Sequence, residues 1–423
     1  MSNWHCGLLA AAVWVLATAA ANAANVLDSA PADLPPADAV ERALDGHPQV
    51  RAAQARLAAA RAEDRRLQAG EHPLGLNLSS QRRNTNGGPD YQEWGVGIER
   101  AWRLPGKLGL DQAIGSKGIA EAQERVGDAR HETARQLLGL WYARLQTTVE
   151  TQLWQRQVEF LREQRRTTEI RVKSGDAARL DSLQAESALA QVEAEARRAE
   201  ARAEVAQAEL AAQFPELSSA VGDSVEPTMP GEGEAVWIAR SLMHNHEILS
   251  VQRAQERLNL QAQRADADRL PDPRLGLHYA RELGGLENIV GVSLSIEIPG
   301  ASQRAKSAMY RAEAAATAEE VAAVRRRLQA EAAGNWQRAS AGVDSYRRLK
   351  AAADSVERHA DLTRRAYDLG ELNLYEVLQA RRAALEARLA AEQERLAANR
   401  AIARLLLDAH SLWLAEPDED EHQ

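Results

Sequence analysis

A short run of alternating residues constrains this chain more than any other part of its sequence. Within residues 286–299, apolar side chains alternate strictly with small or polar ones from Val290 to Ile298. The apolar members are Val290, Val292, Leu294, Ile296 and Ile298. A period of two predicts a β-strand with one apolar and one polar face. The strand has about ten residues, the length that a tilted strand needs to cross the hydrocarbon core of a bilayer. Because the rest of the chain has mainly helical patterns, the fold has to place an amphipathic strand between long helices.

The composition favours long helices. Among the 423 residues, Ala, Arg, Glu and Leu are common and only two are Phe, which favours helices and coiled coils over a thick aromatic core. The net charge of −9 argues against a general nucleic-acid binder. After the N-terminal segment the chain has no apolar run of about 18 residues, so we expect no transmembrane helix.

Residues 1–24 have the pattern of a signal peptide for export. An apolar run over residues 8–21 is followed by a small-x-small sequence at residues 21–23. The segment before this run has no Lys or Arg, and the alternative interpretation is an N-terminal anchor helix. Cys6 is the only cysteine and lies inside the segment, so the mature chain offers no disulfide, thiol chemistry or Cys-metal site.

The mature chain contains one pattern of elements twice. The first copy, residues 25–213, begins with a helical pattern at 37–70 and continues with a β-hairpin at 74–99. A long helical pattern at 107–173 and a shorter one at 178–212 complete this copy. We therefore expect an order of helix, hairpin, long helix and short helix.

The second copy follows an irregular linker. Pro and Gly residues predict this linker over residues 214–234. The second repeat, residues 235–410, has a helical pattern at 235–270, a β-hairpin at 274–298, and then a long and a short helical pattern. Residues 411–423 form an acidic tail, which we expect to be solvated.

The sequence match between the two copies supports a duplication. Residues 175–185 align with residues 370–380, so that Gly, Leu, Gln and Ala coincide and acids align with acids. Leu104-Pro105-Gly106 likewise corresponds to 298–300, Ile-Pro-Gly. Agreement at equivalent places in two halves indicates an internal repeat.

The predicted hairpins suggest an oligomeric barrel. Two hairpins give four strands per chain, and an isolated hairpin is marginal in water and leaves unpaired backbone groups in lipid. Spanning barrels begin at about eight strands, so strands that enter a membrane need other copies of the chain. The alternative is a soluble hairpin on a helical bundle. Seven-residue spacings, as between Leu378 and Leu385 and between Leu389 and Leu396, predict coiled-coil packing of the helices.

These features resemble the TolC-like outer-membrane efflux proteins. The resemblance covers the mature chain and rests on the repeat, the hairpins between helices and the Gly-x5-[Asp/Glu]-x-Leu-[Gln/Asp]-Ala motif at 175–185 and 370–380. It implies a mainly α fold with a small β part. In this fold, long antiparallel coiled-coil helices form an α-barrel, and each chain contributes four strands to a trimeric transmembrane β-barrel. The barrel lies in the cell outer membrane and the helices extend into the periplasm. The resemblance also implies a homotrimer that acts with a periplasmic adaptor and an inner-membrane pump in a tripartite efflux system.

The resemblance implies two groups of site residues. The turns between helices would dock the adaptor, through Gly175, Asp176, Gly370, Glu371 and Leu372. The periplasmic entrance would be lined by Glu376, Asp181 and Gln379. Gln379 stands where some family members have an acid, and Leu372 stands where some have a gating Arg, which implies a weaker gating network. A trimer would repeat Glu376 in a ring that favours cations. The alternative for Glu376 is a solvated charge on a helix.

The resemblance leaves the exported compound open. The chain length and the Leu-Pro-Gly-Lys turn at 104–107 are similar to the cobalt–zinc–cadmium resistance branch, which implies heavy-metal resistance through export of divalent metal ions. Export of organic compounds and type I secretion are alternatives within the same fold. A soluble periplasmic coiled-coil scaffold or adaptor is the alternative from another class. We expect no enzyme, cofactor or resident metal, since the sequence has no nucleophile elbow, phosphate-binding loop or zinc-protease motif.

Overall fold

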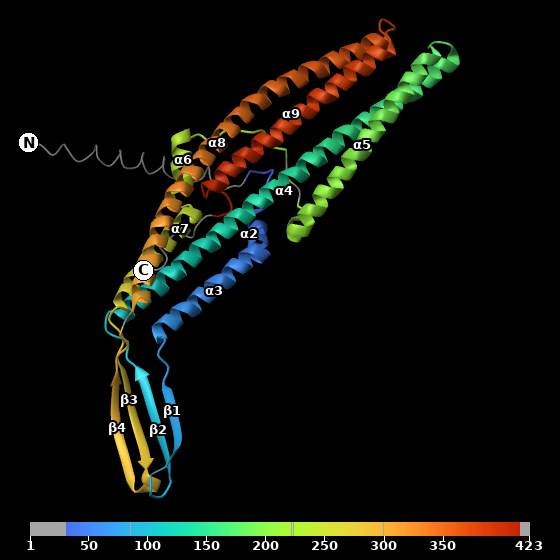
Figure 1. Cartoon of the computed structure of the whole chain (residues 1–423). Helices are drawn as coiled ribbons and strands as arrows, with labels where there is room; N and C mark the ends of the chain where they lie inside the picture. The colour runs from blue at the N-terminus through green and yellow to red at the C-terminus, as the bar shows by residue number, and fades with distance from the viewer. Residues whose placement is uncertain (1–30, 85, 221, 223, 299, 415–423) are drawn as a thin grey trace, which may run out of the picture. The chain divides into compact units, whose positions relative to one another are not determined.

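The computed structural model describes most of the mature chain (Figure 1). The residues it describes are 31–84, 86–220, 222, 224–298 and 300–414. The expected signal peptide at 1–24 lies outside them, and so do residues 415–423 of the expected acidic tail. Among the described residues, no helix is long and apolar enough to cross a membrane.

The chain forms two compact units. The first comprises Met1–Val50, Arg130–His244 and Leu328–Gln423, and the second comprises Arg51–Ala129 and Asn245–Arg327. This division differs from the two predicted repeats, because helices of both halves pass through both units. The repeat boundaries at 25–213 and 235–410 therefore stay a prediction.

The helices account for most of the described residues. They are α2 (Ala37–Gly46), α3 (Pro48–Ala69), α4 (Lys107–Ser174), α5 (Arg179–Gln213), α6 (Glu234–Met243), α7 (His246–Ala267), α8 (Ala301–Asp368) and α9 (Leu374–Asp408). Short 3-10 turns occur at η1 (Pro215–Leu217) and η2 (Leu283–Gly285). The long helices α4 and α8 have 68 residues each, and each is followed by a helix of 35 residues. The predicted order of long and short helices is thus present in both halves.

The first unit has its main core where four helices meet. The fully buried side chains of Leu44, Trp141, Leu210 and Leu407 come from α2, α4, α5 and α9. The Trp141 indole Nε1 donates to the backbone carbonyl of Asp33 at 2.7 Å, so the segment before α2 is bound to α4. Toward their turns, α4 and α5 form one helical hairpin and α8 and α9 form the other (Figure 1).

The second unit contains a four-stranded antiparallel sheet. Its strands are β1 (Gly75–Arg83), β2 (Tyr91–Ala101), β3 (Arg274–Glu282) and β4 (Glu287–Ser295), in the order β1-β2-β3-β4. The two predicted hairpins therefore join through β2 and β3, although they lie far apart in sequence. Within the described residues, the outer edges of β1 and β4 have no strand partner.

The sheet has one apolar and one small or polar face. The strand register places four apolar side chains in one row, which is Leu76, Ile98, Leu277 and Val292. The next row, on the opposite face, is Asn77, Gly97, His278 and Gly291. The apolar row is 43–72% exposed in the single chain. The predicted alternation is confirmed, and its apolar face has no cover within the described residues.

The prediction of one helix at 37–70 is wrong in one detail, because the helix is broken at His47. His47 has an extended backbone with ψ 136°, and Pro48 follows it. A residue before proline is disfavoured in the helical region, because the proline ring would contact its backbone. The break separates α2 from α3.

The expected helix at 235–270 is also broken, at Asn245. The Asn245 side chain accepts hydrogen bonds from the backbone N–H groups of Glu247 and Ile248, at 3.1 and 3.2 Å. This is an N-cap, which begins a new helix by satisfying its first free donors. The break separates α6 from α7 and corresponds in the repeat to the break before Pro48.

Strand β4 is shorter than expected, since it ends at Ser295 rather than at residue 298. Ser295 pairs with Arg274, the first residue of β3. The ladder between these two strands therefore ends where β3 begins. At its other end, β4 is joined to β3 by η2, within the loop that the glycines predicted.

Candidate functional site at the helical turns

The two turns between long and short helices have the same backbone geometry. Gly175 has φ +85° and Gly370 has φ +82°, the left-handed conformation that glycine adopts without strain. The N–H of Asp176 donates to the Arg171 carbonyl at 2.8 Å, and the N–H of Glu371 donates to the Ala366 carbonyl at 2.9 Å. These are Schellman ends, in which a glycine stops the helix and orphan carbonyls gain donors. The repeated sequence motif thus forms the same turn in both halves of the chain.

Glu376 caps the helix that begins after the second turn. Its carboxylate accepts from the Asn373 N–H at 3.1 Å, and the Asn373 side chain accepts from the Glu376 N–H at 3.1 Å. This reciprocal pair is a capping box at the start of α9. A negative charge is also favourable at the positive end of a helix dipole. Glu376 therefore caps α9, and this structural role is separate from the role at the periplasmic entrance that we expect for it.

Asp181 forms only one of the two hydrogen bonds of such a capping box. Its carboxylate accepts from the Ala178 N–H at 3.3 Å, at the start of α5. Ala178 has no side-chain acceptor, whereas Asn373 occupies the equivalent place in the second half. The aspartate and glutamate of the motif align because both cap the first turn of a helix.

The other expected tip residues lie at the surface of these turns. Asp176 is exposed and accepts from the Ser174 hydroxyl at 2.7 Å. Gly175, Gly370 and Glu371 are exposed, and Leu372 is partly buried. The surface of each turn is therefore accessible in the single chain.

The structure brings the two turns together through a small apolar core. Ala185 of α5, Tyr367 of α8 and Val377 of α9 are buried in one cluster, and Phe160 of α4 packs against it. The Arg171 guanidinium lies 5.0 Å from the centre of the Tyr367 ring, which is cation–π geometry between the two hairpins. The helices that carry the expected entrance residues thus contact each other near the turns.

Two guanidinium groups lie close to the Phe160 ring. Arg364 lies 5.4 Å and Arg381 4.9 Å from its ring centre. Arg381 also bonds Glu357 at 2.6 Å and Asp361 at 2.8 Å, so it connects α9 to α8 and to α4. The Arg381 side chain is only 16% exposed. Partial burial strengthens these contacts relative to ion pairs in water.

Gln379 lines a neutral groove beside this contact. The groove has a volume of about 700 Å³ and lies between α4, α5 and α9. Gln379 and its repeat equivalent Gln184 both line it, together with Trp154. Glu376 and Asp181 are not among its lining residues. The structure therefore joins the two glutamines of the motif in one groove and leaves the two acids at the helix starts.

Phe160 and Arg381, which contact each other between the two hairpins, were not predicted from the sequence. Counting from Gly175 and Gly370, Phe160 corresponds to Ser355 and Arg381 corresponds to Glu186. A comparison of the repeats cannot find residues that differ between them. The one signal in the sequence was that Phe is rare in this chain, which draws attention to Phe160. This signal does not predict which side chains contact the Phe160 ring.

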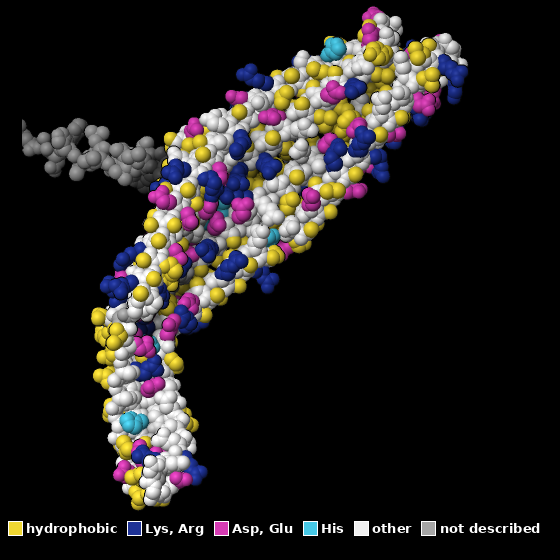
Figure 2. Space-filling model, in the orientation of Figure 1, with side chains coloured by type: hydrophobic (Ala, Val, Ile, Leu, Met, Phe, Trp, Pro, Cys, Tyr) yellow, Lys and Arg dark blue, Asp and Glu magenta, His cyan; other side chains and the backbone are white. Residues whose placement is uncertain are grey.

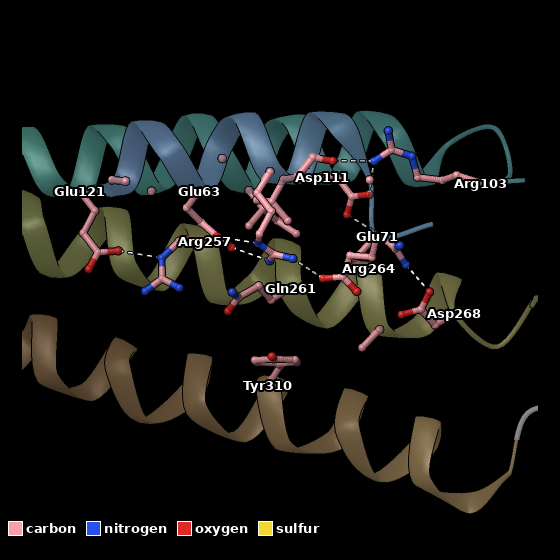
Figure 3. A pocket seen from close by; sticks show the side chains of 18 of the residues that line it. Glu63, Glu71, Arg103, Asp111, Glu121, Arg257, Gln261, Arg264, Asp268 and Tyr310 are labelled. Atoms are coloured by element: carbon pink, nitrogen blue, oxygen red, sulfur yellow. Dashed lines mark hydrogen bonds and ion pairs between the residues drawn. The ribbon is translucent and has the colours of Figure 1, made fainter. Parts of the chain in front are cut away.

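A further charged pocket lies in the second unit. It has a volume of about 570 Å³ and is lined by α3, α4, α7 and α8 (Figure 3). Arg257 donates to Glu121 at 2.8 Å, and Asp111 accepts from Arg103 at 2.9 Å and from Arg264 at 2.6 Å. These side chains form hydrogen bonds and ion pairs with one another. They connect the helices near the ends of the strands. None of the site residues expected from the sequence lines this pocket. No group of three or more His, Cys, Asp or Glu within the described residues could hold a metal ion.

The chain is similar to known outer-membrane proteins. Residues 39–219 match a family model described as Outer membrane efflux protein. No curated protein matches the chain in a sequence comparison. Among solved structures, CusC, which forms a transmembrane channel, matches with a TM-score of 0.73 and 14% identity over 88% of this chain and 91% of that chain.

Two further channels agree with this fold. The outer-membrane channel OprN matches with a TM-score of 0.73 and 20% identity, over 89% of this chain and 90% of that chain. The outer membrane protein VceC of Vibrio cholerae matches with a TM-score of 0.70 and 17% identity, over 87% of this chain and 95% of that chain. At these identities the likeness shows the fold.

Proposed function

We propose that this chain is a TolC-like outer-membrane efflux protein and that it forms the exit duct of a tripartite efflux system in the cell outer membrane. The sheet is the observation that carries the proposal. Its apolar face suits lipid, and its small or polar face suits a water-filled lumen. The outer edges of β1 and β4 need partners, because unpaired backbone groups are costly in lipid. Other copies of the chain can supply these partners.

A homotrimer is the assembly that we propose. Family members form trimers, and three copies of the four strands give a closed barrel of twelve. The same symmetry would place the helical hairpins of three copies around one axis, as an α-barrel that extends into the periplasm. The family consists of channels, and we propose no enzymatic activity.

The helical turns are the proposed contact with a periplasmic adaptor protein, which is fed by an inner-membrane pump. The turn residues Gly175, Asp176, Gly370 and Glu371 are exposed, and Leu372 lies beside them. Leu180 is 62% exposed and Leu369 is 77% exposed, so each turn also carries an apolar side chain that a partner can cover. We propose that these groups dock the adaptor.

The proposed entrance is formed by Glu376, Asp181 and Gln379. Both acids lie one turn inside the helix starts, and Gln379 lines the neighbouring groove. Three copies would give rings of carboxylates, which attract cations. We therefore propose divalent metal ions as the first cargo to test. A strain without the gene should become sensitive to such ions, whereas sensitivity to dyes and antibiotics alone would point to organic cargo.

The assembly is tested first by the mass of the extracted protein. The full chain is expressed in a host with an outer membrane, and the outer-membrane fraction is extracted with detergent. Light scattering with the detergent mass subtracted should give three chains per particle, found in that fraction alone. A monomer or dimer released with the soluble periplasmic fraction would contradict the duct and favour a coiled-coil scaffold.

A further inference from the structure

A short turn covers part of the small or polar face of the sheet, at the end of the sheet away from the helices. This turn is η2, which joins β3 to β4, and the connection between β1 and β2 lies at the same end (Figure 1). Figure 2 shows acidic and basic side chains close together at this end. In the proposed duct the helices extend into the periplasm, so this end of the sheet would form the outer mouth of the barrel.

Glu93 of β2 holds η2 in this position. The Glu93 side chain lies on the small face, two residues along the strand from Gly95, and it is only 2% exposed. Its carboxylate accepts a hydrogen bond from the backbone N–H of Leu283 at 3.2 Å. Because Leu283 is the first residue of η2, this bond places the turn over the face that carries Glu93.

Two donors from β1 fix the Glu93 carboxylate. The Gln81 amide donates to it at 2.8 Å, and the Arg83 guanidinium lies 2.6 Å from it. Arg83 also pairs with Glu282, the last residue of β3 before the turn. Hydrogen bonds between ionised groups are stronger than those between neutral groups. The network therefore connects β1, β2 and β3 firmly to the start of η2.

The backbone of η2 has a conformation that depends on such contacts. Leu283 has φ +51°, in the left-handed region that a residue with a side chain rarely adopts and that persists where surrounding contacts hold it. A Cβ added at Gly284 would lie 3.3 Å from the ring of Tyr91, on the small face, and Gly285 ends the turn beside Arg281 of the opposite face. We therefore expect η2 to move away from the small face when the contact with the carboxylate is lost.

The small face is open next to the part that η2 covers. A hollow of about 160 Å³ lies there, and its lining includes Ser79, Gly95 and Gly97. Ser79 is exposed and pairs in register with Gly95, two residues nearer the helices than Glu93. A group attached at position 79 would therefore report on the proposed lumen just inside η2.

We propose that Glu93 is a positioning residue that holds η2 over the lumen face at the outer mouth of the duct. Three copies of the turn would narrow the mouth and limit the size of the molecules that pass it. The inference rests on the proposed duct, because only a closed barrel gives the small face a lumen. It adds a limit on size at the outer end, separate from the proposed entrance at the helical turns.

Labelling of a single cysteine in intact cells tests this inference. In a Cys6→Ser background, Ser79→Cys places a thiol on the small face, and membrane-impermeant maleimides of increasing size are added outside the cells. The tested change is Glu93→Ala. The matched control is Asp90→Ala, which removes an acid at the same end of the sheet that pairs with the exposed Arg82. Gels of unheated membranes show whether each variant assembles.

Small maleimides should label Ser79→Cys in every variant, because they pass the mouth with η2 in place. Large maleimides should react about tenfold faster with Glu93→Ala than with the wild type, since hydrogen bonds to a charged group are strong enough to shift a local equilibrium by that factor. Asp90→Ala should react like the wild type. Glu93→Gln keeps an acceptor for the Leu283 N–H and should restore part of the size limit, whereas Arg83→Gln weakens the same network and should relax the limit.

Equal labelling by large maleimides in the wild type and in Glu93→Ala, with small ones reacting in both, would overturn the role of Glu93 and leave the duct intact. If Glu93→Ala does not assemble, Arg83→Gln decides the question by the same comparison. A thiol at position 79 that even the smallest maleimide does not reach, in assembled protein, would contradict the lumen itself and with it both proposals.

Discussion

His131 illustrates how burial sets the charge of one side chain. Its ring lies inside the first unit, and its Nε2 is 3.1 Å from the Leu407 carbonyl, to which it donates. Burial, with help from the nearby Arg135 guanidinium, lowers the pKa of His131 to about 3. The ring is therefore neutral in the folded protein at any pH that a cell meets. The unfolded chain, in contrast, has an imidazole with a pKa of about 6.5.

This difference predicts a pH dependence of stability. Because the folded pKa is depressed, the contribution of His131 is complete above about pH 6.5 and is lost as the pH falls toward the folded pKa. Between pH 7 and pH 5 the wild type should lose about 2 kcal/mol through this residue. His131→Gln keeps a donor near Leu407 and should show that much less pH dependence in unfolding measurements in detergent. His359→Gln, at an exposed position, should follow the wild type. Identical pH profiles for wild type and His131→Gln would contradict the assignment.

Glu376 allows its two roles to be separated by substitution. Its carboxylate accepts from the Asn373 N–H, a bond that a glutamine oxygen can also accept. Glu376→Gln should therefore leave the unfolding free energy within about 0.5 kcal/mol, while Glu376→Ala should cost about 1 kcal/mol. If the acid also lines the proposed entrance, Glu376→Gln alone should reduce the preference for cations in planar bilayers. Loss of stability in both variants with unchanged ion selectivity would leave Glu376 only its capping role.

At the scale of elements, the sheet predicts a strong difference between neighbouring positions. Leu76 points to the apolar face and Asn77 to the small face, as the register of β1 and β2 shows. An arginine on a lipid-facing position costs about 2–4 kcal/mol at the middle of the bilayer, whereas a lumen position tolerates it. Leu76→Arg should lower the amount of assembled protein in the outer membrane, and Asn77→Arg should not. Immunoblots of heat-untreated membrane fractions measure both, and equal yields would argue against insertion of this sheet in lipid.

The elements differ in how far the sequence could predict them. The alternation in β4 and the glycines at 175 and 370 are local signals, so the strands and the helical turns were predictable. The break at His47 also has a local cause in Pro48, but the amphipathic pattern continues across it and hides it. The end of β4 at Ser295 depends on where its partner strand β3 begins, at Arg274. Pairing between distant strands is not visible in either strand alone.

The residues of the candidate site also differ in whether the sequence could predict them. Gly175, Gly370 and the capping acids repeat in sequence and could be found there. Phe160 and Arg381 contact each other across two helical hairpins, and neither has a repeat equivalent of its own kind. Their importance arises from tertiary packing. A pattern that is periodic along one helix does not specify which side chain of another hairpin it meets.

At the scale of the whole assembly, Arg381 is the residue whose loss we expect to change the opening of the duct most. It connects α9 to α8 through Glu357 and Asp361, and it contacts the Phe160 ring on α4. In the proposed trimer these contacts occur three times around the entrance. We infer that they stabilise the closed arrangement of the hairpins.

Arg381→Ala is therefore expected to raise the single-channel conductance in planar bilayers, because the hairpins lose a contact that holds them together. The matched control is Arg382→Ala, since the Arg382 side chain is 69% exposed and pairs with Glu386 on its own helix. That variant should conduct like the wild type, and both variants should remain trimers. Should Arg381→Ala conduct like the wild type while still trimeric, the contact would stabilise each chain without restraining the entrance, and the control of opening would have to lie between the copies.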